Sequence, residues 1–305
     1  MKNISIEDLI KEYTQTGFTA GAFGKACKII ESMISDSNTG IFLSLSGALV
    51  PAGQQAHIVK MIKTNRIKAI VATGATLTHD YIEDLGFRHQ QVDITKDDSE
   101  LRKEGINRIY DMMAIDEAFV QMEKDIHRFL GKHYSNENRD SIILSTPKLL
   151  YEMGKQRSEK SILGICAKLN IPIFVPAFTD SMLGVHVMTY REDHSYFMVD
   201  MMAELKEFLS LCFDQSSTGA IVLGGGVPKN YLFQGMLVSG KELKYAIQIT
   251  MDHPEHGGLS GASLDEAISW GKINSEARFS TVVADVTLVL PILSEWMTFC
   301  QNKKN

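Results

Sequence analysis

Short apolar runs that end in small residues are the feature of this sequence that most restricts its fold. The run at 41–47 (IFLSLSG) leads into a helical pattern at 52–63, and the run at 67–76 (IKAIVATGAT) repeats the arrangement. Apolar runs of this length suit strands that are buried on both faces, as the strands of parallel sheets are. In such folds, ligands gather at the carboxyl ends of the strands. The pattern predicts a doubly wound α/β fold with a mainly parallel sheet.

Later segments continue the alternation of strands and helices. Further strands are expected within 171–180 (IPIFVPAFTD), 219–232 (GAIVLGGGVPKNYL), 244–250 (KYAIQIT) and 280–293 (STVVADVTLVLPIL). Helical patterns occupy 5–14, 22–35, 146–154, 158–169 and 197–213, and the charged stretch 97–138 is mostly helical, with a solvated loop (SNENRD) at 135–140. Because no internal repeat or linker interrupts the chain, we expect a single domain over residues 1–305.

Composition excludes several classes of protein. The chain carries 31 basic and 37 acidic residues, a net charge of −6, which gives no support to a nucleic-acid-binding surface. Its four cysteines are scattered without a C-x-x-C pair, so no metal site is indicated and a reducing compartment is the simplest interpretation. No stretch approaches the roughly 18 apolar residues of a membrane span. We expect a soluble, cytoplasmic protein with neither a nucleic-acid nor a membrane partner.

The stretch 252–273 (DHPEHGGLSGASLDEAISWGKI) combines a glycine-rich turn, a short helix and a lysine. Glycines there let a ligand or another segment approach the main chain closely. Lys272 lies beside Trp270, and a lysine that is desolvated and neutral is a nucleophile able to form a Schiff base. Structural alternatives stay open. Ser263 and Glu266 have the spacing of a capping box. Lys272 can also complement a helix C-terminus, and Trp270 can belong to the core.

Small and polar residues follow several of the predicted strands. Neither early turn contains G-x-G-x-x-G, and tight-turn geometry is a sufficient reason for small residues there. The three glycines 224–226 permit close approach of a ligand to the main chain. Asp180 either caps the helix that begins near Ser181 or accepts hydrogen bonds from a cofactor's ribose. Asp285 lies inside an apolar run and needs a partner such as a helix or loop N–H.

Four separated motifs resemble the deoxyhypusine synthase family. They are TGFTAGAFGKA at 16–26, PAFTDSMLG at 176–184, LGGGVPKN at 223–230 and EAISWGKI at 266–273, and the match runs from about Thr14 to about Met297. The resemblance implies a Rossmann-like fold that binds NAD as a recycled redox cofactor. In the family, the lysine of the W-G-K triplet carries a covalent imine, and Lys272 is the matching residue.

The resemblance also implies roles for other residues of this chain. Cofactor contacts are expected from Ser46, Gly47, Thr73, Gly74, Asp180, Ser260 and Asp285. Substrate contacts are expected from Gly225, Asn230, Glu266 and Trp270. A homotetramer with sites shared between paired subunits is expected as well.

Several positions depart from the family's pattern. Asn230 stands where the family has a histidine, and asparagine cannot act as a base near neutral pH. Acidic positions of the family are occupied here by Thr78, His79, Val185, His256 and Leu259. A polyamine needs anionic partners in register with its amines, so these changes bear on which amine is recognised.

Three functions remain open at this point. The first is an NAD-dependent aminobutyl transferase that uses a polyamine donor and an amine acceptor, which is a protein lysine in the family's founding reaction. The second is a transferase acting on free amines, like a homospermidine synthase. The third is a non-catalytic protein that binds NAD or a polyamine.

Overall fold

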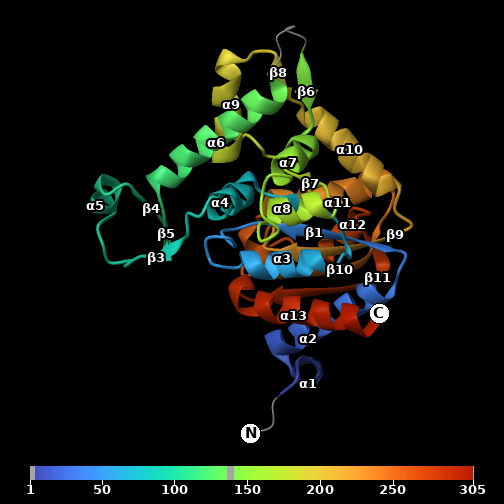
Figure 1. The fold of residues 1–305 in the computed structure, drawn as a ribbon. Helices are drawn as coiled ribbons and strands as arrows, with labels where there is room; N and C mark the ends of the chain where they lie inside the picture. The colour runs from blue at the N-terminus through green and yellow to red at the C-terminus, as the bar shows by residue number, and fades with distance from the viewer. Residues whose placement is uncertain (1–3, 136–140, 305) are drawn as a thin grey trace. The chain divides into compact units, whose positions relative to one another are not determined.

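The computed structural model describes residues 4–135 and 141–304 (Figure 1). Residues 136–140, most of the loop expected at 135–140, lie outside the described part of the chain. The chain forms two compact units. The first unit contains residues 1–46, 57–72 and 205–305, and the second contains residues 47–56 and 73–204. The single domain expected over residues 1–305 stays a prediction.

Parallel strands form the core of the first unit. They are β1 (Thr39–Leu45), β2 (Ile67–Ala72), β9 (Ser217–Leu223), β10 (Leu243–Thr250) and β11 (Ile273–Val283). Their order is β11-β10-β9-β1-β2, and every neighbouring pair is parallel. All seven residues of β1 are buried, as expected for a strand that is covered on both faces. The prediction of an α/β fold with a mainly parallel sheet is confirmed.

Helices cover both faces of this sheet. They are α1 (Ile6–Tyr13), α2 (Phe18–Ser35), α3 (Gln55–Lys63), α10 (Met201–Phe213), α11 (Gly226–Ser239), α12 (Glu266–Ser269) and α13 (Val286–Lys304), with a 3-10 turn η1 at Pro254–His256. Figure 1 shows α2 and α13 on one side of the sheet and α11 on the other. The chain moves from β1 to β2 in one direction, and from β9 through β10 to β11 in the opposite direction. This reversal places a topological switch point between β1 and β9.

The second unit is mainly helical. Its helices are α4 (Gly74–Asp84), α5 (Asp98–Lys103), α6 (Asp116–Tyr134), α7 (Thr146–Gly154), α8 (Ile162–Lys168) and α9 (Met182–Asp193). Its strands are β3 (Gln90–Gln91), β4 (Ile106–Ile109), β5 (Met112–Ile115), β6 (Ile142–Leu144), β7 (Ile173–Phe174) and β8 (Phe197–Val199). β3, β5 and β4 form a small antiparallel sheet. Within the described residues, no helix has the length and apolar character that crossing a membrane requires.

Three elements differ from the sequence-based expectation. The helix expected at 197–213 begins only at Met201, because 197–199 forms β8. The stretch 97–138 is not helical throughout, because β4 and β5 form a hairpin within it, with Tyr110 at φ 56° in the turn. The pairing of β4 with β5 stabilises the two strands, and the charged composition of this stretch does not reveal that pairing. β11 begins at Ile273, earlier than the expected 280, and its first half exposes polar residues. Those residues interrupt the apolar pattern from which the strand was inferred.

Asp80 is a buried charge that joins α4 to α8 in the second unit. Its side chain is fully buried, and its carboxylate accepts hydrogen bonds from the main-chain N–H groups of Ile162 (2.7 Å) and Leu163 (3.0 Å). Gln55 Nε2 donates a third hydrogen bond over 2.7 Å. Burial raises the pKa of Asp80 to about 6, although the hydrogen bonds act in the opposite direction.

Replacing Asp80 by asparagine is expected to destabilise the protein by about 1–3 kcal/mol at pH 7, because the amide NH2 would face main-chain donors. The raised pKa means that the folded state binds its proton more tightly than the unfolded state. The part of the stability that is linked to protonation of Asp80 is therefore present below about pH 4 and lost as the pH rises through about 6, while the hydrogen bonds to the carboxylate remain at pH 7. Asp80→Asn should remove this part of the pH dependence in denaturant unfolding. The exposed Asp193→Asn is the control, and equal unfolding curves for the two variants would contradict the assignment.

Candidate active site

The turns after the parallel strands lie along one edge of the first unit's sheet. Ser46 N–H donates to the carbonyl of Leu223 over 3.1 Å, and Gly224 N–H donates to the carbonyl of Ile249 over 2.8 Å. Ala284 N–H donates to the carbonyl of Thr250 in the same way, over 3.1 Å. These bonds extend the sheet beyond the strand ends, so the turns after β1, β9 and β11 are held in register at the edge where α/β folds bind ligands.

The triple-glycine turn at 224–226 sits at the switch point and permits close packing. Gly224 and Gly226 have φ values of 83° and 63°, in the left-handed region that favours glycine. A Cβ on Gly225 would lie 2.5 Å from the Cα of Ser260, and one on Gly224 would lie 2.4 Å from Ser46 Oγ. Gly225 N–H donates to Ser46 Oγ over 2.7 Å. Only glycine allows the two serines to approach the main chain this closely.

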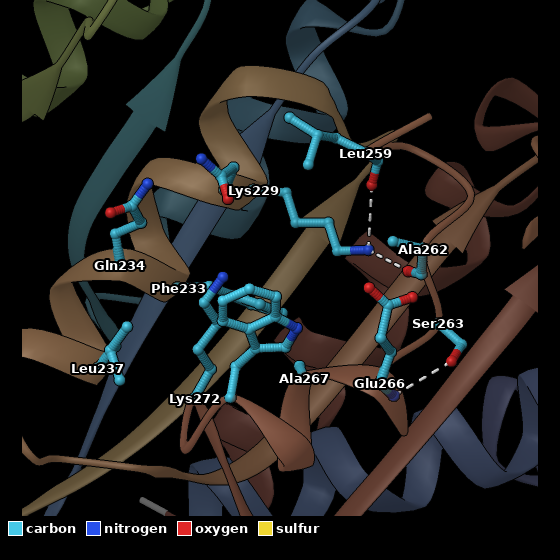
Figure 2. Close-up of a pocket in the computed structure, with 12 residues that line it drawn as sticks. Lys229, Phe233, Gln234, Leu237, Leu259, Ala262, Ser263, Glu266, Ala267 and Lys272 are labelled. Atoms are coloured by element: carbon cyan, nitrogen blue, oxygen red, sulfur yellow. Dashed lines mark hydrogen bonds between the residues drawn. The ribbon is translucent and has the colours of Figure 1, made fainter. Parts of the chain in front are cut away.

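A cavity of about 350 Å³ lies beside this turn, entirely within the first unit (Figure 2). α11, the loop before α12, and the segment from α12 to Lys272 form its walls. Its lining residues are Lys229, Asn230, Phe233, Gln234, Leu237, Leu259, Ala262, Ser263, Glu266, Ala267, Trp270 and Lys272. The structure thus gathers Lys272, Glu266, Trp270 and Asn230 in one cavity.

Lys272 and Trp270 face each other across the turn that ends α12. Lys272 Nζ lies 5.2 Å from the centroid of the Trp270 ring, a cation–π distance. Trp270 is 59% exposed, so the alternative in which it belongs to the core is wrong. An exposed aromatic face and a half-buried amine at the same cavity can together receive a cationic or amine ligand.

Glu266 provides a carboxylate in the cavity. Its main-chain N–H donates to Ser263 Oγ over 3.2 Å, which is one half of the predicted capping box. Within the described residues, no hydrogen bond returns from the carboxylate to the main chain of Ser263. Figure 2 shows the carboxylate directed toward Lys229 instead. Glu266 is therefore available to bind a ligand's ammonium group.

Lys229 is a second lysine of the cavity, and the sequence-based reasoning missed it. Its side chain is only 4% exposed, and Nζ donates to Gln248 Oε1 (2.9 Å) and to the carbonyls of Leu259 (3.3 Å) and Ala262. Burial lowers the pKa of Lys229 to about 8, with Glu266 opposing this shift. One signal could have revealed it: Lys229 precedes the core residue Phe233 by one helical turn, so it lies on the buried face of α11.

The residues that depart from the family's pattern fall in both units. Asn230 and Leu259 line the cavity of the first unit, where they supply an amide and an apolar wall. His256 is exposed, and its Nδ1 lies 2.5 Å from Asp252 Oδ1. In the second unit, Val185 is 36% exposed on α9.

His79 belongs to a hydrogen-bonded chain of the second unit. Its Nδ1 lies 2.9 Å from His89 Nε2, and His89 Nδ1 lies 2.7 Å from Glu83 Oε1. Burial and then the neighbouring His89 lower the pKa of His79 to about 4. His79 is thus a neutral ring near neutral pH and does not replace the charge of a family carboxylate.

Three of the residues expected to contact a cofactor lie in the first unit. Ser46 and Ser260 flank the triple-glycine turn, as described above. Asp285 follows β11, and its Oδ1 accepts hydrogen bonds from the N–H (2.8 Å) and Oγ1 (2.9 Å) of Thr287 at the start of α13. Asp285 therefore has the N–H partner that its place in an apolar run requires, and its contact with a cofactor stays a prediction.

The other expected cofactor residues lie in the second unit. Gly47 has φ 82°, and Thr73 caps α4 by accepting a hydrogen bond from Thr76 N–H over 3.3 Å. A Cβ on Gly74 would lie 2.4 Å from Ser181 Oγ. Ser181 itself caps α9, so the alternative in which Asp180 is the cap is wrong, and Asp180 is exposed. The contacts of these residues with a cofactor stay predictions.

Comparison with known proteins gives consistent results. The family model of deoxyhypusine synthase matches residues 8–297. A Methanosarcina acetivorans protein named probable deoxyhypusine synthase 1 is 41% identical over 292 residues, covering 95% of this chain and 90% of the relative. An Archaeoglobus fulgidus protein of the same name is 37% identical over 297 residues, covering 97% and 95% of the two chains.

Among solved structures, a candidate deoxyhypusine synthase from Entamoeba histolytica has the same fold. Its TM-score is 0.67 at 18% identity, and the match covers 96% of this chain and 93% of the other. Identity this low supports the fold alone, whereas the sequence relatives and the family model extend over nearly the whole chain. This chain belongs to the deoxyhypusine synthase family.

Proposed function

We propose that this protein is an NAD-dependent aminobutyl transferase that takes its alkyl group from a polyamine and carries it as an imine on Lys272. The observation that carries the proposal is the meeting of Lys272, Trp270 and Glu266 in one cavity of the first unit. A nucleophilic amine, an aromatic face and a carboxylate are the three groups needed to hold and react with an alkylamine.

The two lysines of the cavity differ in their availability. Lys229 is buried and uses its ammonium on three protein acceptors. Lys272 is half-buried, and its Nζ lies over the ring face of Trp270. We assign the nucleophile to Lys272 because its amine can reach a ligand without breaking a hydrogen-bond network. Glu266 would bind the ammonium at the far end of the alkyl fragment, with a cation–π contribution from Trp270.

The strand ends of the first unit suit a dinucleotide. α11 begins without a side-chain cap at Gly225, so its first N–H groups are available to a phosphate. Ser46 and Ser260 add hydroxyl groups at the switch point, Asp285 adds a carboxylate after β11 at the same edge of the sheet, and these groups suit phosphate and ribose oxygens. We therefore propose that these residues hold NAD. When bound, NAD supplies a hydride acceptor and donor for the interconversion of an amine and an imine.

The chain's own residues then act by exchange of amines. The amine of Lys272 adds to the imine carbon, and the original amine leaves, so that a new C=N bond replaces the old one without a change in oxidation state. An acceptor amine reverses the exchange and frees Lys272. Asn230 can orient these amines by hydrogen bonds, but it cannot take up a proton, so the proton passes between the entering and leaving amines.

The proposed function has two forms, which differ in the amine that accepts the aminobutyl group. Transfer to a protein lysine is the reaction for which the family is named, and we take it as the first candidate. Transfer to a free amine is the second candidate, because Leu259 stands at an acidic position of the family and leaves Glu266 as the single carboxylate among the described residues that line the cavity. Assembly as a homotetramer, which the family resemblance implies, is part of the same proposal.

Incubation with NAD and a polyamine, followed by borohydride reduction, should leave an alkyl adduct on Lys272 that peptide mass spectrometry detects. Spermidine, putrescine and homospermidine are the donors to compare, and the adduct's mass identifies the transferred fragment. Lys272→Ala should abolish the adduct, whereas the exposed Lys68→Ala should retain it. Absence of an adduct with every donor, in protein shown to bind NAD, would reject the imine mechanism and favour a binding protein.

Glu266→Gln is expected to lower kcat/KM for the amine donor about 10- to 100-fold, because a hydrogen bond between two charged groups is lost. Steady-state kinetics with the donor identified by the adduct measures this. Glu276→Gln on the exposed part of β11 is the matched control and should change kcat/KM little. Equal kinetics of the Glu266 variant and the unchanged protein would show that the carboxylate does not bind the donor.

A further inference from the structure

Two buried polar side chains hold the loop 259–262 by its main-chain carbonyls. Lys229 Nζ donates to the carbonyls of Leu259 and Ala262, and Gln248 Nε2 donates to the carbonyl of Ser260 over 2.8 Å. Gln248 also joins the two donors to each other, because its Oε1 accepts from Lys229 Nζ over 2.9 Å. Both side chains are nearly inaccessible, with exposures of 4% and 0%. Together they satisfy three carbonyls of one short loop.

The same pair connects this loop to the triple-glycine turn. Gln248 Nε2 donates a second hydrogen bond, over 3.1 Å, to the carbonyl of Gly224. Ser260 packs so tightly against Gly225 that a Cβ there would lie 2.5 Å from the serine's Cα. The loop therefore belongs to two surfaces, since Ser260 lies at the strand ends while Leu259 and Ala262 line the cavity that contains Lys272.

The other main-chain hydrogen bonds of the loop are local. Gly257, with φ 72°, and Gly258 precede it, and both allow a wide range of main-chain conformations. Within the loop, the N–H groups of Gly261 and Ala262 each donate to the carbonyl of Gly258 over 3.1 Å. Two glycines before the loop and one within it leave the main chain few side chains to order it, so the groups that bind its carbonyls add to the close packing of Gly261 against His253 in fixing its position.

We propose that Lys229 is a positioning residue, whose buried ammonium, acting with Gln248, fixes the loop 259–262 between the strand-end turn and the cavity of Lys272. The ammonium suits this role because it offers three donors and all three have acceptors on the protein. A neutral amine has two N–H groups and can keep only two of these hydrogen bonds. Loss of the proton from Lys229 thus breaks one of its three hydrogen bonds and leaves one acceptor without a donor.

Charged groups on the neighbouring elements bear on this proton. Glu266 of α12 favours the ammonium form of Lys229, whereas Lys272 and the desolvation of the buried site disfavour it. The ring of Phe233, 5.8 Å from Nζ, adds a cation–π contact. Because the pKa of Lys229 is lowered to about 8, the loop should be held firmly at pH 7 and less firmly at pH 9.

Hydrogen exchange of the main-chain amides in 258–263, measured on the full chain without ligands, tests the proposal. Lys229→Met keeps the length of the side chain and removes its donors, and it should raise exchange in this segment at least about tenfold at pH 7. Gln248→Leu should have a similar effect, and the double variant should add little to either, since both act on one network. Lys272→Met is the matched control, because it removes a lysine of the same cavity that does not bind the loop.

The outcomes separate this proposal from the proposed function. If Lys229→Met folds, as shown by a single cooperative unfolding transition, and exchanges in 258–263 at the rate of the unchanged protein, the positioning role is rejected. If Lys229→Met does not fold, hydrogen exchange of the unchanged protein at a series of pH values tests the positioning role instead. Corrected for intrinsic base catalysis, its exchange in 258–263 should rise between pH 7 and 9, and a flat profile rejects the role. If no adduct forms on Lys272, the proposed transferase function is rejected. The exchange measurement on the loop 259–262 does not depend on that result.

Discussion

The buried ammonium of Lys229 is the interaction on which the arrangement of the cavity depends. A charge placed away from water is costly unless it is hydrogen-bonded, and here all its donors have acceptors on the protein. Two of those acceptors are carbonyls of the loop 259–262, which follows Gly257 and Gly258. The hydrogen bonds that satisfy the ammonium of Lys229 also order the loop, and the ordered loop places Ser260 against the triple-glycine turn.

The contrast between two lysines of one cavity shows how environment divides roles. Lys229 lies on the buried face of α11 among protein acceptors, which suits a structural cation. Lys272 follows the turn after α12 and is half-buried beside the exposed ring of Trp270. Residue type alone does not distinguish them, because both lie in motifs that resemble the family's. Their neighbours in space make the distinction.

The departures from the family's pattern have physical consequences of different weight. Asn230 and Leu259 lie in the cavity, where they change how an amine would be bound and how its proton would move. His79 is held by His89 and Glu83 in the second unit, and the low pKa makes it a neutral ring near neutral pH. The redox and lysine chemistry that we propose does not require a charge at Asn230 or Leu259. These two substitutions therefore bear on which amine is bound.

The sequence by itself determined the parallel sheet, the glycines at its switch point and the set of Lys272, Trp270 and Glu266, because these follow from local apolar periodicity, glycine conformation and a short contiguous motif. It did not reveal the β4–β5 hairpin, which depends on a turn at Tyr110, or the early start of β11, where Ile273 pairs with Leu243 of β10. Nor did it reveal Lys229 and Gln248 as a pair. They are 19 residues apart on α11 and β10, and their partners lie in a loop beyond both. Only the tertiary structure decided that a lysine, a glutamine and three carbonyls share one buried space, because that contact requires the helix to fold back onto the sheet.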